Sequence, residues 1–79
     1  MTSSSANPMT LNDIYLKLSE RVSTYNARLM LRSAMLSSGV IGEDSQVLEN
    51  EQAKAICLAL INKGGPAFQV GKSMYQTLQ

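Results

Sequence analysis

The sequence predicts an all-α protein, and three observations carry this prediction. Apolar residues recur at alternating spacings of four and three through the first half of the chain, which is the pattern of one helix face. A second apolar run, AICLALI, continues a helical pattern that starts at Glu51. Gly39 and Gly64 stand where two of the helices would end. We therefore expect a disordered leader over residues 1–9 and one small three-helix domain over residues 10–79.

The first predicted helix is the longest and spans residues 10–37. Thr10 suits its N-cap, and Asp13 places negative charge near the N–H groups of the first turn. Its apolar stripe has the 4-3 spacing of a coiled-coil seam, with Arg32 as the only interruption. The stripe comprises Leu11, Tyr15, Leu18, Val22, Tyr25, Leu29 and Leu36. Residues 22–26 are β-branched or hydroxyl-rich, so a kink is expected there.

Two shorter helices follow. The first of them is expected to be capped by Asp44 or Ser45 and to end near Lys63. The second starts at Pro66, because proline fits the first helical position. Gly71 weakens that helix by roughly 1 kcal/mol relative to alanine, so we expect a neighbouring helix backbone to pass close to it.

Helix lengths predict how these elements pack. At 1.5 Å per residue the first helix is about 40 Å long, and the other two are roughly 25 and 20 Å long. We expect the shorter helices to return along the first one, the second helix covering residues 29–36 and the third covering residues 11–25. Because a chain of 79 residues builds only a small core, a homodimer formed through the stripe is favoured.

The stretch LINKGGPAFQVGKS (residues 60–73) resembles a phosphate-binding loop at its Gly-Lys-Ser end. The motif G-x-x-x-x-G-K-[ST] needs a glycine five residues before Gly71, where this chain has Pro66. A start at Gly65 makes the loop one residue too long. The stretch is therefore interpreted as a junction between two helices.

Composition narrows the function further. The net charge of +1 gives no general argument for binding a polyanion. With no histidine and a single cysteine, Cys57, we expect no metal, no cofactor and no catalysis. No apolar run approaches the ~18 residues of a membrane span and no secretory signal is recognisable, so a cytoplasmic protein is expected.

The candidate surface lies on the first helix. Four basic residues at spacings of 4, 7 and 4 fall on one narrow stripe beside the apolar seam. We expect this stripe to be solvated or paired with acids of residues 43–51, to dock on an acidic protein partner or, as the least favoured alternative, to contact nucleic acid. Two tyrosines on the seam have the amphipathic side chains that interfaces favour. The candidate partner-binding residues are Lys17, Arg21, Arg28, Arg32, Tyr15 and Tyr25. The predicted function is a noncatalytic protein–protein interaction module, an adaptor or regulator.

The alternative is a small transcriptional regulator of the helix-turn-helix type, with residues 66–79 as the recognition helix. Its exposed side would carry residues suited to base edges and phosphates. These residues are Gln69, Lys72, Ser73 and Gln76. Only one of them is basic, whereas phosphate contacts normally supply much of the affinity for DNA.

Overall fold

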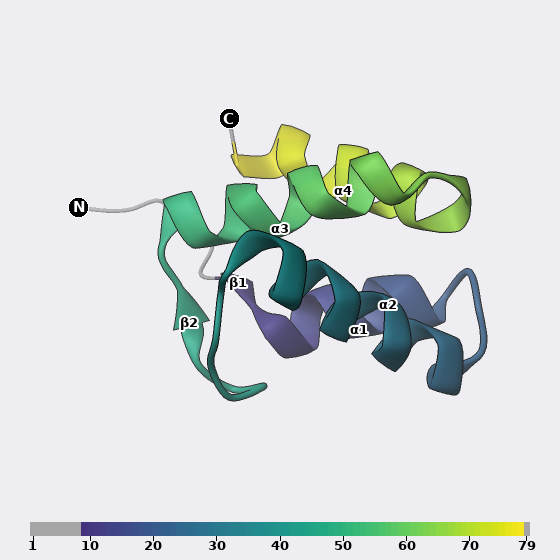
Figure 1. Ribbon diagram of the computed structural model, residues 1–79, viewed down its shortest axis with the longest axis horizontal. Helices are drawn as coiled ribbons and strands as arrows, with labels where there is room; N and C mark the ends of the chain where they lie inside the picture. The colour runs from purple at the N-terminus through teal and green to yellow at the C-terminus, as the bar shows by residue number, and fades with distance from the viewer. Residues whose placement is uncertain (1–8, 79) are drawn as a thin grey trace.

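The computed structural model describes residues 9–78, which form four helices and one short two-stranded sheet (Figure 1). In chain order these elements are β1 (Met9–Thr10), α1 (Leu11–Ser19), α2 (Thr24–Ser38), β2 (Val47–Leu48), α3 (Asn50–Lys63) and α4 (Gly65–Leu78). The predicted helical class is confirmed, with the small sheet as an addition. No helix in this part of the chain is both long and apolar enough to cross a bilayer.

The single helix predicted over residues 10–37 is instead two helices, because the chain reverses at residues 20–23. The Leu18 carbonyl accepts the N–H groups of two residues in this turn, at 3.0 and 3.1 Å. Ser23 then adopts an extended conformation (ψ 157°), and its hydroxyl accepts the N–H of Asn26 at 3.2 Å, which caps α2. The expected kink is thus a complete reversal that lays α2 beside α1 (Figure 1).

The two ends predicted for the first helix agree with the structure, as the start of α1 and the end of α2. Thr10 caps α1: its hydroxyl accepts the N–H of Asp13 at 3.1 Å, and the Asp13 carboxylate accepts the Thr10 N–H at 2.9 Å. Gly39 ends α2 in the left-handed conformation, with φ 76°. Both predicted boundaries are confirmed.

The β1–β2 pair alters the start of the second predicted helix. Met9 lies opposite Leu48 in an antiparallel register, and Met9 is buried although the sequence assigned it to the leader. Because the chain is extended at β2, α3 begins at Asn50 and its N-cap is Glu49, rather than the predicted Asp44 or Ser45. The remainder of the predicted leader, residues 1–8, lies outside the described residues.

The helix partners follow the prediction, but their arrangement does not. α3 contacts α2, and α4 contacts α1. The two shorter helices do not lie end to end, however; α3 and α4 run antiparallel and side by side (Figure 1). The molecule therefore consists of two helical hairpins, α1–α2 and α3–α4, packed against each other.

Glycines create the α3–α4 hairpin. Gly64 and Gly65, with φ of 81° and 60°, form the turn between the helices. A Cβ atom on Gly71 would lie 2.7 Å from the Cys57 carbonyl oxygen and 2.9 Å from Leu60 Cβ, so the predicted close helix approach is confirmed. The Gly-Lys-Ser segment lies inside α4, and the helix junction predicted before it is also confirmed.

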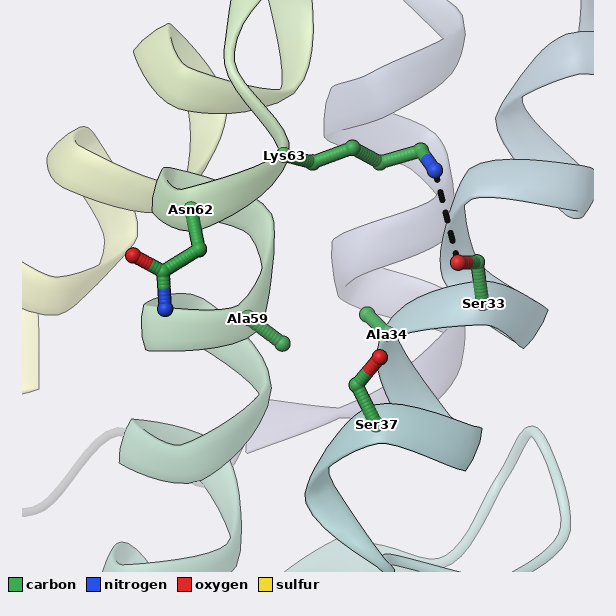
Figure 2. A pocket seen from close by; sticks show the side chains of 6 residues that line it. All are labelled: Ser33, Ala34, Ser37, Ala59, Asn62 and Lys63. Carbon is green, nitrogen blue, oxygen red and sulfur yellow. Dashed lines mark hydrogen bonds between the residues drawn. The ribbon is translucent and has the colours of Figure 1, made fainter.

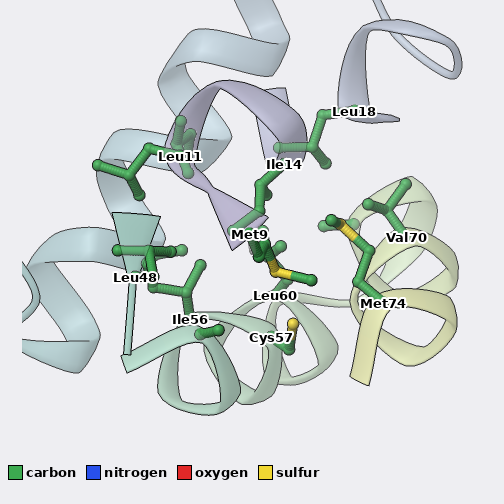
Figure 3. Packing of buried hydrophobic residues seen from close by; sticks show 14 of the residues in the cluster. Met9, Leu11, Ile14, Leu18, Leu48, Ile56, Cys57, Leu60, Val70 and Met74 are labelled. Carbon is green, nitrogen blue, oxygen red and sulfur yellow. The ribbon is translucent and has the colours of Figure 1, made fainter. Parts of the chain in front are cut away.

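One apolar cluster fills the space between the two hairpins (Figure 3). Its buried members are Met9, Leu11, Ile14, Leu18, Ala27, Leu31, Ala34, Val40, Leu48, Ala53, Ile56, Cys57, Leu60, Ala67, Val70 and Met74. The predicted stripe is therefore confirmed at Leu11 and Leu18. It is wrong in α2, where Tyr25, Leu29 and Leu36 are exposed, because the turn at residues 20–23 directs this face away from the core.

Candidate docking surface on α2

Helix α2 is apolar on two opposite faces. At about 100° per residue, its buried residues Ala27, Leu31 and Ala34 share one side of the helix. The opposite side, here called the outer face of α2, consists of Tyr25, Leu29, Arg32 and Leu36. Their apolar side chains are largely uncovered: Tyr25 is 73 % exposed, Leu29 48 % and Leu36 79 %. A surface helix normally carries polar residues on that side.

An open groove of about 800 Å³ lies beside the outer face. It runs between α2 and the segment of residues 39–44 that follows the helix. Its apolar lining consists of Leu31, Met35, Leu36, Val40 and Ile41. Ile41 is 85 % exposed, so both an apolar helix face and an apolar loop residue border the groove.

The charged residues at the groove are not equivalent. Arg28 Nη1 lies 3.7 Å from Asp44 Oδ2, and the Arg28 guanidinium carbon lies 4.6 Å from the centre of the Tyr15 ring. Internal pairing is therefore confirmed for Arg28, although such an exposed pair contributes only about 0–1 kcal/mol. It is the only ion pair found within residues 9–78, so Arg32 lines the groove without an acidic partner from that part of the chain.

The structure divides the predicted basic stripe between two helices. Lys17 lies in the last turn of α1, and Arg21 lies in the turn that follows. Both are exposed, whereas Arg28 and Arg32 lie on α2 beside the groove. The continuous stripe depended on an unbroken helix, so these four residues do not lie along one helix.

The structure places the two tyrosines in different surroundings and places two leucines of the predicted seam on the surface. Tyr15 is half-buried beneath Arg28, while Tyr25 belongs to the outer face of α2. Leu29 and Leu36 were expected in a seam and instead form the exposed surface. No pattern in the sequence indicated that Ile41 would border a groove; it is an apolar residue in the segment between Gly39 and Gly42.

A second, smaller pocket of about 240 Å³ lies between α2 and α3 (Figure 2). Its lining consists of Ser33, Ala34, Ser37, Ala59, Asn62 and Lys63. The Lys63 ammonium donates a hydrogen bond to the Ser33 hydroxyl at 3.3 Å. A cation in the last turn of α3 is also favoured by the helix dipole, so the contact is a structural link between the two helices.

Two other features bear on the chemistry that the sequence raised: the polar side of α4 and the single cysteine. The polar residues of the proposed recognition helix are exposed on α4, but α4 lies along α3, and Lys72 Nζ is 6.0 Å from the Phe68 ring centre. Cys57 is buried in the core, and burial raises the pKa of its thiol to about 11. Within residues 9–78 no cluster of three or more His, Cys, Asp or Glu residues could hold a metal ion.

The chain matches no family model, no curated protein and no solved structure.

Proposed function

We propose that this protein is a noncatalytic protein–protein interaction module, an adaptor or regulator, that docks a partner on the outer face of α2 and the adjoining groove. One observation carries the proposal: α2 is apolar on two opposite faces, and only its inner face is covered. Contiguous apolar surface of this kind is uncommon on monomers and characteristic of interaction sites.

The groove also defines the chemistry of the partner. Apolar residues line it, and Arg32 adds a positive charge that no acid in residues 9–78 neutralises. A protein segment with apolar side chains and at least one carboxylate complements both features. Self-association, which the sequence favours, is the rival occupant.

Binding of random duplex DNA at low salt should be absent at micromolar protein, because the module presents few cations.

Two leucines of equal exposure provide a matched test. Leu29 on the outer face and Leu58 on α3 are each 48 % exposed. The partner is first captured from the native host with the wild-type protein. Leu58→Ser should bind this partner with unchanged affinity, whereas Leu29→Ser should bind it at least about tenfold more weakly, as expected for an apolar residue inside an interface. Calorimetry with the purified partner gives the two affinities.

The result that contradicts the proposal is equal affinity in both variants, or a loss confined to Leu58→Ser. Circular dichroism of the two variants serves as the folding control. Both leucines are half exposed, so neither serine should unfold the protein.

A further inference from the structure

The outer face of α2 offers a partner only side chains. Its residues, spaced 4, 3 and 4 apart, span about 16 Å of the helix. Apart from those in its first and last turns, the backbone groups beneath them are used in the hydrogen bonds of α2 itself. An extended partner lying on this apolar face would leave its own N–H and C=O groups without bonds, whereas a helix satisfies them internally. The geometry therefore favours a helical partner.

Arg32 adds a requirement for charge. It lies between Leu29 and Leu36 on the same face, where a packed helix would cover its aliphatic stem. Arg28 is already engaged with Asp44 and Tyr15, but Arg32 has no acidic partner within residues 9–78. A carboxylate opposite Arg32 would neutralise it and fix the register of the pairing, as single polar residues do in coiled coils.

A second copy of α2 does not meet that requirement. In a parallel pair Arg32 would face its own counterpart. In the antiparallel pair that matches the spacing, Tyr25 of one copy would face Leu36 of the other, and Leu29 would face Arg32. The two Arg32 side chains would then lie within about one helical turn of each other. Like charges at such a separation oppose association.

We propose that the partner element is an amphipathic α-helix from a different protein. It carries apolar residues at the same 4-3-4 spacing and one Asp or Glu at the position that faces Arg32. The inference rests on the proposed function, since it assumes that the outer face of α2 is the docking surface.

Two synthetic helical peptides test it. They share leucines at the other seam positions and differ only in a central Glu or Lys. Each is titrated into the ¹⁵N-labelled wild-type protein and into Arg32→Glu, with the amide signals of α2 as the readout. The Glu peptide should bind the wild type at least about tenfold more tightly than the Lys peptide, and the order should reverse in Arg32→Glu.

The inference is overturned if neither peptide shifts the α2 amides, or if both bind equally to both proteins. Sedimentation of the wild type at twice the 8.6 kDa chain mass, with return to monomer in Leu29→Ser, would identify a second copy as the occupant and also overturn it. If a natural partner loses affinity for Leu29→Ser but binds Arg32→Glu as tightly as the wild type, the proposed function stands. Only the carboxylate opposite Arg32 is then rejected.

Discussion

At Gly71 a missing side chain determines how closely two helices pack. A β-carbon there would lie 2.7 Å from a backbone oxygen of α3, which cannot rotate away as a flexible side chain would. Gly71→Ala gains roughly 1 kcal/mol of helix propensity but suffers overpacking of about 1–3 kcal/mol. We expect a net loss of about 1 kcal/mol in the free energy of unfolding, measured by urea denaturation. Ser73→Ala, on the exposed side of α4, is the control, and an unchanged or higher midpoint for Gly71→Ala would contradict the close approach.

The buried thiol of Cys57 makes the free energy of unfolding depend on pH in the alkaline range. Its folded-state pKa is about 11 against an ordinary value of 9.0, because burial disfavours the thiolate. Above pH 9 the unfolded chain loses this proton while the folded chain retains it, so the free energy of unfolding falls between pH 9 and 11 and is unaffected below pH 9. The decline should approach 1.4 kcal/mol per pH unit, to order of magnitude. The free energy of unfolding of Cys57→Ala, measured by urea denaturation over the same pH range, should lack this decline. If the wild type and Cys57→Ala lose stability in parallel as the pH rises, the thiol does not titrate as inferred.

At the scale of the element, the turn at residues 20–23 explains what the sequence could and could not predict. No glycine or proline marks it, and the apolar spacing continues through it without a change of phase. The local pattern thus favours one helix, whereas tertiary packing of α1 against α2 and α4 favours a reversal. The caps at Thr10, Gly39 and Gly64 were predictable because they depend on neighbouring residues alone.

The same turn separates the surface from the core. With α2 reversed, Tyr25, Leu29 and Leu36 leave the core side, and Ala27, Leu31 and Ala34 replace them. The apolar character of the outer face was visible in the sequence. Its exposure was not, because the β-branched and hydroxyl-rich residues 22–26 predicted only a kink, whereas the exposure depends on a complete reversal of the chain.

A proline at Thr24 tests the reversal directly. Thr24 is the first residue of α2, where proline lacks no needed N–H, and Ser23 before it already has the extended conformation that proline requires. Thr24→Pro should leave the free energy of unfolding within about 1 kcal/mol of the wild type. In one continuous helix the same change would cost about 3 kcal/mol or more. Urea denaturation measures this, with Met30→Pro inside α2 as the disruptive control.

At the scale of the whole molecule, the helix pairs were predictable but their layering was not. Lengths and apolar patterns matched α3 to α2 and α4 to α1. Whether the shorter helices would lie end to end or side by side depended on the hairpin turns at residues 20–23 and 64–65. The β1–β2 pair escaped prediction because it joins distant segments of two residues each, too short to show a strand pattern.

The two hairpins should unfold together, because they share one core. Leu18 from α1, Leu31 from α2, Cys57 from α3 and Met74 from α4 belong to the same buried cluster, and neither hairpin has a separate one among the described residues. Loss of either hairpin would expose the apolar surface of the other, so a single cooperative transition is expected.

Two tyrosines that pack against this cluster report on the separate hairpins: Tyr15 on α1 and Tyr75 on α4. In variants that retain only Tyr15 or only Tyr75 of the three tyrosines in the chain, fluorescence should give the same urea midpoint as circular dichroism of that variant. An earlier midpoint for Tyr15 would mean that α1–α2 opens while α3–α4 remains folded. In that case the outer face of α2 would belong to a hairpin that can detach, and a partner bound there would have to stabilise the hairpin as well as cover it.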